Sequence, residues 1–320
     1  MGVVGCADIA WRRTLPAMVA GGSIEVAAVG SRSKDKAEKF ADRFGGAAVE
    51  GYAALLDRDD VDAVYIPLPA LMHTEWVARS LEAGKHVLVE KPMSGSLRDT
   101  AGLIELARSR DLVLVENYMF LHHSQHATAQ KMLADGVIGD LRSFSSSFTF
   151  PPKPAGDIRY QRDVGGGAFT DFGGYSVRAA QLYLDGDLDV IGAVFRHDLS
   201  KGVVLAGNVL LTTVDGVTAQ LEFGMEHSYC NSYCLSGSTG RLSLDRVFTP
   251  AETYRPVLRV DRQDHTEEFT LAADDQVANV LVYFLDAVLG SVDVRSAQEA
   301  TLRQAALIEQ IEQKAVRIKI

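Results

Sequence analysis

The triplet Glu90-Lys91-Pro92 follows the apolar segment 86–89 (HVLV), which is typical of a short buried strand. Ligands of open α/β sheets bind where such strands end, so Lys91 is placed to give a proton and a positive charge to a substrate oxygen. Lysine has a pKa of about 10.4 and stays protonated at neutral pH, which favours reduction of a carbonyl group. A solvated loop lysine is the alternative for a single residue, and the motifs described next favour the chemical role.

A second motif, residues 5–10 (GCADIA), lies between the first predicted strand and the first predicted helix. It fits G-x-A-x-x-A, a relaxed form of the phosphate-binding turn, in which small residues allow a tight turn, close approach of a pyrophosphate and packing of the helix on the strand. The start of the helix offers free N–H groups to phosphate. The residues assigned to this turn are Gly5, Ala7, Asp8, Ile9 and Ala10.

The end of the second predicted strand indicates which dinucleotide binds. An NAD site usually has an acidic residue there, whereas this chain has Ser31 and Arg32, with Lys36 one turn further on. Arginine can clamp a 2′-phosphate and stack on adenine, so we expect NADP(H) rather than NAD(H). A solvated helix start with Ser33 as N-cap is the other interpretation, and it is compatible with the first.

The elements that carry these motifs alternate between strand and helix over residues 1–120. Strands are predicted at 3–5, 25–30, 62–67, 86–89 and 112–116, and helices at 11–19, 34–44, 74–83 and 98–108. Such alternation predicts an α/β fold with a doubly wound parallel sheet of the Rossmann type. Residues 1–120 are therefore expected to form a dinucleotide-binding domain.

Residues 121–320 have a different pattern, with long strand-like runs between turn signals. Helices are predicted at 122–133, 169–184, 276–289 and 297–315, strands at 140–150, 190–198, 203–214, 217–223 and 229–235, and a Pro/Gly-rich loop at 151–167. This pattern predicts an α+β domain with a large, mostly antiparallel sheet, joined to the first domain without a flexible tether. One face of that sheet lacks enough helix to cover it, so we expect a homo-oligomer, either dimer or tetramer.

Composition excludes several classes of function. The 320 residues include 42 acidic and 32 basic ones, for a net charge of -10, and no basic block stands out. Binding to nucleic acid or to an anionic membrane is therefore not expected. No apolar run approaches the roughly 20 residues that span a bilayer, and no secretory signal is evident. The first predicted strand begins close to Met1, which leaves open whether residues precede it.

Cysteine and histidine spacing predicts no metal site. Three sparse cysteines suit a reducing cytoplasm, and the C-x3-C pair Cys230 and Cys234 has no further cysteine or HxxxH motif nearby. His122, His123 and His126 lack the partner carboxylate of H-E-x-x-H, so we expect them on a helix surface.

Several motifs coincide in order along the chain. They are the turn at Gly5, the pair Ser31-Arg32, Pro67-Leu68-Pro69 followed by His73, segment 83–92 (AGKHVLVEKP), and residues 165–168 (GGGA) before Asp171 and Tyr175. Through them the chain resembles, over essentially its whole length, the Gfo/Idh/MocA family of NAD(P)-dependent sugar oxidoreductases. Within that family it is most similar to the bacterial nucleotide-sugar C-3 ketoreductases of deoxysugar biosynthesis. The segments that carry this similarity are 5–18 (GCADIAWRRTLPAM), 116–126 (ENYMFLHHSQH), 151–169 (PPKPAGDIRYQRDVGGGAF) and 211–229 (LTTVDGVTAQLEFGMEHSY).

The resemblance implies an activity: reduction by NADPH of the C-3 keto group of a dTDP-linked 3,4-diketo-6-deoxyhexose. The lysine of the family falls on Lys91, which would protonate the developing alkoxide. Many members have a D-x-x-x-H motif, in which this chain keeps Asp171 and has Tyr175 at the histidine position. Tyr175 would then orient the ketone or relay a proton, and a dyad of the inositol-dehydrogenase type is put in doubt.

Other site residues are expected from position or from the resemblance. Beyond the phosphate turn, the expected cofactor contacts are Ser31, Arg32, Leu68, His73, Glu90, Lys91, Asn117 and Arg159, of which Arg159 reaches cofactor or substrate. The expected substrate contacts are Lys91, Asp171, Tyr175 and Tyr229. Lys153 and Arg162 are cations that either meet a diphosphate or remain solvated in their loop.

Two other functions remain open from the sequence. One is a sugar, cyclitol or dihydrodiol dehydrogenase of the same family that works in the oxidative direction. Tyr175 in place of histidine and Arg32 in place of an acid argue against it. The other is a non-catalytic NADP-binding regulator, and the presence of both Lys91 and Tyr175 argues against that role.

Overall fold

The computed structural model describes residues 1–320, and these form two compact units. The first unit contains Met1–Tyr118 and Val277–Leu302, and the second contains Met119–Gln276 and Arg303–Ile320. The sequence analysis predicts a change of fold near residue 120 and does not predict that a later segment, Val277–Leu302, returns to the first unit. This return is fixed by side chains of that segment: Gln298 accepts a hydrogen bond from Arg108 Nε at 2.9 Å, and Thr301 donates to Glu116 Oε2 at 3.0 Å.

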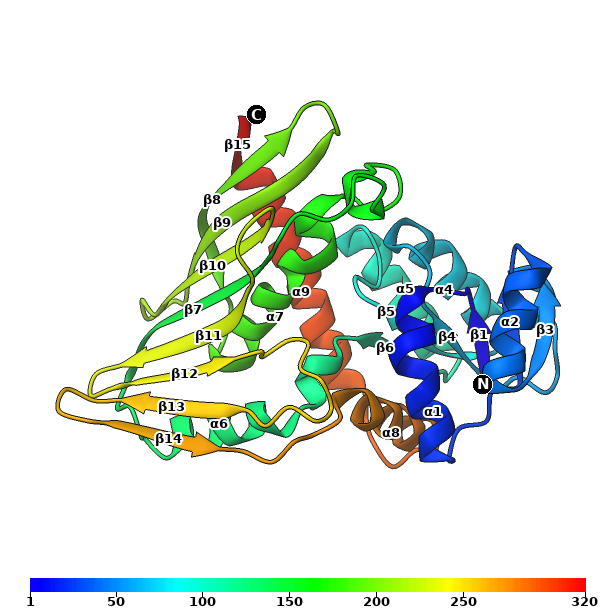
Figure 1. Cartoon of the computed structure of the whole chain (residues 1–320), viewed down its shortest axis with the longest axis horizontal. Coiled ribbons are helices and arrows are strands. Elements are labelled where there is room, and N and C mark those ends of the chain that lie inside the picture. Colours follow the sequence, from blue (N-terminus) through cyan, green and yellow to red (C-terminus); the bar gives the residue numbers. More distant parts are fainter. The chain divides into compact units, whose positions relative to one another are not determined.

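The first unit is a doubly wound sheet of six parallel strands, as predicted (Figure 1). Its order is β3-β2-β1-β4-β5-β6. The order therefore reverses between β1 and β4, and ligands bind at such a switch point in open α/β sheets. The strands are β1 Gly2–Val4, β2 Ala28–Ser31, β3 Ala47–Glu50, β4 Ala63–Ile66, β5 His86–Glu90 and β6 Leu114–Asn117. The helices are α1 Leu15–Gly21, α2 Lys34–Phe44, α3 Tyr52–Leu56, α4 His73–Glu82, α5 Leu97–Ser109 and α8 Gln276–Val288.

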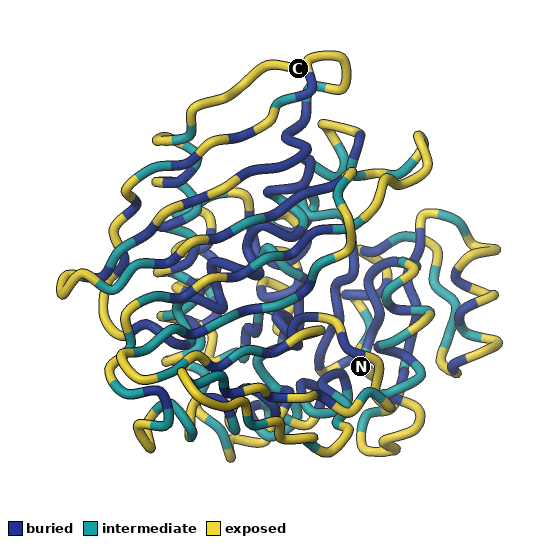
Figure 2. Tube along the Cα trace, turned by 60° about the vertical axis from the view of Figure 1, so that its left-hand side comes forward, coloured by how far each residue is buried: buried dark blue, intermediate teal, exposed yellow.

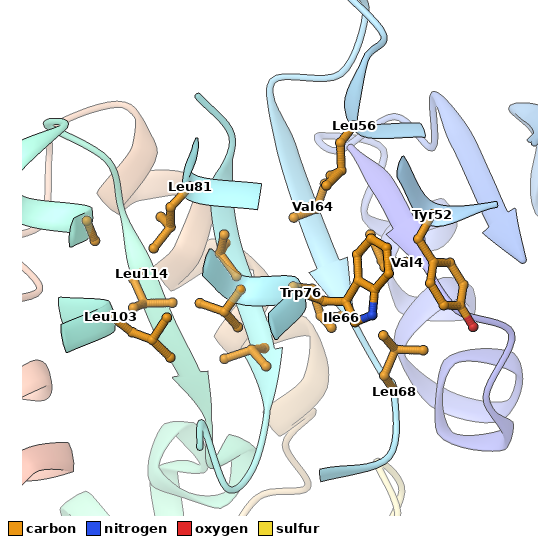
Figure 3. Packing of buried hydrophobic residues seen from close by; sticks show 14 of the residues in the cluster. Val4, Tyr52, Leu56, Val64, Ile66, Leu68, Trp76, Leu81, Leu103 and Leu114 are labelled. Atoms are coloured by element: carbon orange, nitrogen blue, oxygen red, sulfur yellow. The ribbon is translucent and has the colours of Figure 1, made fainter. Parts of the chain in front are cut away.

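Two short elements of this unit, β3 and α3, escape prediction. Segment 47–50 (AAVE) has a single β-branched residue, and α3 is a little over one turn long, so neither gives a periodic signal. Their place is set by packing. Leu55, Leu56 and Tyr52 of α3 join the apolar cluster with Val4 and Trp76 (Figure 3). This packing brings Tyr52 to the edge where the strands end.

The second unit is built on a nine-stranded mixed sheet in the order β14-β13-β12-β11-β7-β10-β9-β8-β15. Only the β7/β10 and β8/β15 pairs are parallel, so the sheet is mostly antiparallel, as predicted. Its strands are β7 Leu141–Phe150, β8 Asp189–Asp198, β9 Val203–Thr212, β10 Thr218–Met225, β11 Cys230–Gly237, β12 Arg241–Asp245, β13 Val257–Asp261, β14 Thr266–Thr270 and β15 Ala315–Lys319. The helices are α6 Ser124–Ala134, α7 Gly174–Tyr183 and α9 Arg295–Lys314, of which α9 begins in the first unit.

The two faces of this sheet differ in character. In β7, Phe144, Ser146 and Phe148 are buried, whereas Ser145 and Ser147 alternate with them and point outward. Figure 2 shows the same alternation of buried and exposed residues along the strands, with no helix in front of the sheet. Helices therefore cover one face only, as expected from the sequence. The strands β12, β13, β14 and β15, which are five residues each, were not predicted.

The prediction that the three histidines lie on a helix surface is wrong. His123 and His126 are each 1% exposed, and burial lowers the pKa of His126 to about 3. Burial and the charge of Arg178 also lower the pKa of His122 to about 4. His126 Nε2 donates to Val247 O, and its Nδ1 lies 3.3 and 3.1 Å from the hydroxyls of Tyr183 and Tyr233. No apolar periodicity in the sequence predicts this polar core of His126, Tyr183 and Tyr233.

No helix in the chain combines the length and the apolar character that crossing a membrane requires.

Candidate active site

The phosphate turn in the first unit has the geometry that its sequence predicts. Gly5 has φ of 116°, a conformation that side chains rarely adopt, and its N–H donates to Gly30 O at 3.0 Å. This φ favours glycine, and a Cβ there would also lie 2.7 Å from Leu68 Cδ2. The first helical hydrogen bond runs from Trp11 N to Ala7 O, which leaves the N–H groups of residues 8–10 free for an anion. The turn therefore fits a dinucleotide phosphate.

A π-helical turn, Ala10–Thr14, joins this phosphate turn to α1. Such turns are rare and often occur at functional sites. Asp8 lies at the start of the helix, where its exposed carboxylate pairs with Arg12 one turn on. Asp8 and Ile9 are therefore expected to bind the cofactor phosphate through their main-chain N–H groups.

Polar groups gather where β2 ends. Ser31 is buried and its Oγ accepts a hydrogen bond from Ser33 N at 3.2 Å, whereas Arg32 is exposed. Burial raises the pKa of Tyr52, and a hydrogen bond with Arg32 acts in the opposite direction. Burial likewise raises the pKa of the Cys6 thiol, against the influence of Ser31 and Lys36. Arg32, the cation predicted for a 2′-phosphate, directly follows Ser31 and lies close enough to Tyr52 for its charge to act on that hydroxyl. Sequence reasoning missed Tyr52 because α3 gave no signal.

His73 begins α4, after the end of β4, and its ring has main-chain partners that the sequence did not predict. Its Nδ1 lies 2.6 Å from Pro92 O and its Nε2 lies 2.7 Å from Leu68 O. Burial lowers the pKa of His73, although both carbonyl oxygens favour the protonated ring. Both ring nitrogens lie within hydrogen-bonding distance of main-chain carbonyl oxygens, so His73 holds the local main chain in place, and its contact with the cofactor stays a prediction. His73 ties the segment after β4 to the loop that carries Lys91.

The carboxylate of Glu90 is the centre of a buried hydrogen-bond network. Tyr65 OH donates to Glu90 Oε1 at 2.8 Å, Asn117 Nδ2 donates to the same oxygen at 2.7 Å, and Thr14 Oγ1 lies 3.0 Å from Tyr65 OH. Burial raises the pKa of Glu90, and the positive charge of Lys91 opposes this rise. The network joins β4, β5, β6 and the turn before α1 directly beneath the start of the Lys91 loop.

Sequence reasoning placed Glu90 and Asn117 but missed Thr14 and Tyr65. A tyrosine inside the buried strand 63–66 (AVYI) was the available signal, because a buried phenol needs a hydrogen-bond partner. Asn117 is fully buried and its Oδ1 has no partner in the protein. That orphan acceptor, at the carboxyl end of β6, is consistent with a ligand donor at this edge.

Lys91 follows β5 directly, at the carboxyl edge of the parallel sheet, as predicted. The side chain is half-buried, and its peptide bond to Pro92 is cis. Its charge acts on both Glu90 and His73, which places the ammonium group close to the network and to the β4 segment. This arrangement holds a cation at the switch-point edge of the sheet.

In the second unit, the Pro/Gly-rich loop and the helix after it bring Arg159 to Asp171. Arg159 Nε donates to Asp171 Oδ2 at 2.6 Å, and its Nη1 donates to Asp157 Oδ1 at 3.1 Å. A Cβ at Gly165 would lie 2.3 Å from Ile158 O, so the glycine allows the loop to close on itself. Asp171 is part of a π-helical turn, Phe169–Gly173, that precedes α7. The structure therefore brings together two predicted residues that are 12 positions apart.

Tyr175 stands in a cage of aromatic rings. The ring centroids of Phe120, Phe148 and Phe248 lie 5.8, 5.3 and 5.4 Å from that of Tyr175. The cage residues come from three separate segments, and sequence reasoning identified none of them. Tyr229, by contrast, is half-exposed, in the loop before β11, where Asn231 Nδ2 donates to its hydroxyl at 3.3 Å.

Comparison with known proteins agrees with this architecture. Residues 1–118 match the profile described as the oxidoreductase family with an NAD-binding Rossmann fold, and residues 126–243 match the GFO/IDH/MocA C-terminal domain. The chain is 57% identical over 311 residues to the dTDP-3,4-didehydro-2,6-dideoxy-alpha-D-glucose 3-reductase of Actinomadura kijaniata, with 97% of this chain and 94% of the relative covered. It is 52% identical to the enzyme of the same name from Streptomyces antibioticus, with 97% and 95% covered.

Among solved structures, the chain is similar to a 3-ketoreductase from Actinomadura kijaniata in complex with NADP and TDP-benzene. The TM-score is 0.98 at 56% identity, and 100% of this chain and 98% of the other are covered. The predicted resemblance is thus confirmed by sequence and by structure. The chain belongs to the Gfo/Idh/MocA family of oxidoreductases.

Proposed function

We propose that this protein is an NADPH-dependent reductase of the C-3 keto group of a dTDP-linked 3,4-diketo-6-deoxyhexose. The observation that carries the proposal is Lys91, a cation held at the switch-point edge of the sheet above the buried Glu90 network. The relatives named as 3-reductases of such a sugar support the substrate, and the 3-ketoreductase solved with NADP and TDP-benzene supports the cofactor and the nucleotide.

The cofactor supplies a hydride when it is bound. The free N–H groups of residues 8–10 and the close turn at Gly5 would hold its pyrophosphate. Ser31 and Arg32 would hold the 2′-phosphate that distinguishes NADPH from NADH. Leu68 lines the turn, and Asn117 Oδ1 and Glu90 lie at the edge where the reactive ring is expected.

The residues of the chain then act on the ketone. Lys91 gives a proton to the C-3 oxygen and stabilises the negative charge that develops on it. Tyr175 orients the ketone through its hydroxyl or relays the proton. Asp171 would contact the sugar, and its pairing with Arg159 fixes the carboxylate for that contact. In this proposal the first unit binds the cofactor, and the second binds the substrate and forms the oligomer.

The oligomer is proposed to form through the outer face of the nine-stranded sheet. Several large apolar side chains are exposed at the β8, β9 and β15 end of that sheet, namely Ile191, Val194, Leu210, Val316 and Ile318. Exposed apolar area of this kind marks protein interfaces. Light scattering on the purified protein tests this proposal, and a mass equal to one chain would contradict it.

All three cysteines are free, which supports the cytoplasmic location predicted from the sequence.

The central experiment measures NADPH oxidation with a panel of carbonyl substrates. The dTDP-linked diketosugar should be reduced faster than free sugars, inositols or dihydrodiols by several orders of magnitude in kcat/KM, and NADH should replace NADPH poorly. Equal activity on a free sugar would contradict the substrate assignment. Binding of NADPH without reduction of any ketone would support the regulator instead.

A further inference from the structure

One edge of the nine-stranded sheet brings three loops together. β7 runs parallel to β10 and antiparallel to β11, and β11 runs antiparallel to β12. Loops 151–168, 226–229 and 246–256 therefore emerge side by side at the same edge (Figure 1). Two hydrogen bonds join loop 226–229 to the end of β7: His227 N donates to Phe150 O at 3.1 Å, and Thr149 Oγ1 donates to Ser228 O at 2.7 Å. The first of these loops, 151–168, also carries Arg159.

Two cations at this edge have no carboxylate partner. Lys153 Nζ lies 4.9 Å from the ring centroid of Phe150, and the guanidinium of Arg246 lies 5.6 Å from the ring centroids of both Tyr229 and Tyr254. Arg159, on the first loop, is instead neutralised by Asp157 and Asp171. In a chain with a net charge of -10, two unneutralised cations on loops at the same edge of a sheet are suited to an anionic ligand.

The loop segment of Arg246 is held in a fixed form. Arg246 has φ of 53°, in the left-handed region that non-glycine residues rarely adopt. The buried side chain of Asn231 anchors this segment: its Oδ1 accepts from Phe248 N at 2.9 Å, and its Nδ2 donates to Thr249 Oγ1 at 3.1 Å and to Tyr229 OH at 3.3 Å. A single amide thus ties Tyr229 to the Arg246 loop. Strained backbone that the surroundings enforce is common at ligand sites.

The ring of Tyr229 keeps surface available for a ligand. It is 48% exposed although its hydroxyl is anchored, and such a ring can stack on a planar base. Two strand steps separate the end of β7 from the end of β12, which is about 10 Å at the usual strand spacing. That span matches the length of a diphosphate with its ribose.

We propose that Lys153, Tyr229, Arg246 and Tyr254 form the site for the nucleoside-diphosphate part of the substrate. The two cations bind the diphosphate, and the exposed ring of Tyr229 contacts the base, while the ring of Tyr254 also packs near Arg246. Arg246 and Tyr254 were not identified from the sequence. Tyr229, expected to contact the substrate, is now assigned to the base, and Lys153 is assigned to the diphosphate. This inference rests on the proposed function, because that function requires an anionic nucleotide carrier on the sugar.

Calorimetric titration of the full-length protein with dTDP tests the site without turnover. Arg246→Ala should raise the Kd of dTDP at least tenfold, and Arg246→Lys should restore part of the loss because it keeps the charge. Tyr229→Ala should raise it several-fold, whereas Tyr229→Phe should change it less than twofold. Arg241→Ala, an exposed arginine at the opposite end of β12, is the matched control and should bind like wild type.

Thymidine separates the two contributions: its binding should depend on Tyr229 and hardly on Arg246. In turnover assays, Arg246→Ala should raise KM for the ketosugar by the same factor as the Kd of dTDP, with kcat and NADPH affinity nearly unchanged. If wild type binds dTDP and both alanine variants bind it equally well with an unchanged melting temperature, this inference is overturned and the proposed function stands. If wild type neither binds dTDP nor reduces the dTDP-ketosugar, both are wrong.

Discussion

Lys91 and Tyr175, the two proposed catalytic residues, are supported in opposite ways. Lys91 follows a strand end whose neighbours are a buried carboxylate, a phenol, an amide and a histidine that binds two carbonyl oxygens. Tyr175 is 5% exposed, and three phenylalanine rings surround it. The lysine is therefore controlled by charge and hydrogen bonds, whereas the tyrosine is controlled by packing. Substitutions near Lys91 should therefore alter the pH dependence of kcat. Substitutions near Tyr175 should alter the orientation of its hydroxyl.

The largest effect is expected for Lys91→Ala. Loss of the proton donor and of the positive charge should lower kcat by about 10³-fold or more, because general acid catalysis and oxyanion stabilisation both contribute at this level. The Kd of NADPH, measured by fluorescence titration, should stay within a few-fold of wild type. Lys85→Ala at the other end of β5 is the control, since its Nζ only donates to Arg58 O. A kcat within tenfold of wild type would remove Lys91 from the mechanism.

Tyr175→Phe should have the next largest effect. It keeps the ring in its cage and removes the hydroxyl, so kcat should fall by about 10- to 100-fold while the melting temperature stays nearly constant. Tyr183→Phe on the same helix is the opposite case. Its hydroxyl lies 2.5 Å from that of Tyr233 in the polar core, so its loss should cost about 1–3 kcal/mol of stability with little change in kcat. Equal kcat for Tyr175→Phe and wild type would contradict a chemical role for that hydroxyl.

Glu90→Gln should change the pH dependence more than the rate at neutral pH. An ionised Glu90 stabilises the charge on Lys91, so its replacement should move the alkaline fall of kcat to lower pH. A pH–rate profile that superimposes on that of wild type would show that the two charges are not coupled.

The same substitution also tests stability. Burial raises the pKa of Glu90 in the folded state above its usual value of 4.5, so folding takes up a proton between the two values. The contribution of this carboxyl to stability is therefore fully present below pH 4.5 and falls as pH rises through the folded-state pKa. The glutamine variant lacks this loss. Its melting temperature should decline less than that of wild type over the same range, as calorimetry at several pH values would show.

The smallest effect is expected for Phe120→Leu in the cage. This substitution replaces a fully buried ring by a smaller side chain, should cost about 1–2 kcal/mol and loosens Tyr175, so kcat should fall a few-fold. Phe195→Leu, in a separate cluster with Phe169 and Phe223, is the matched control. It should cost similar stability and leave kcat unchanged. An equal fall of kcat in both variants would mean that the cage has no specific role.

The parts of the site that lie at strand ends were predictable, because a parallel sheet presents every carboxyl end at one edge. Gly5, Arg32, Glu90, Lys91 and Asn117 each follow or close a predicted strand, and all lie at that edge. His73 was also placed near it, but the two carbonyl oxygens beside its ring nitrogens were not predicted. The sequence thus predicted where a side chain lies along a strand, but it did not predict the partners of the His73 ring nitrogens.

The sequence by itself determined the family and the fold class, because apolar periodicity and short motifs are local properties of the chain. Only the tertiary structure decided which residues surround those groups. Tyr65 and Thr14 beneath Glu90, Phe248 beside Tyr175 and Asn231 behind Tyr229 are brought there by packing and hydrogen bonds between segments far apart along the chain. Such contacts depend on long-range geometry, which no local pattern records.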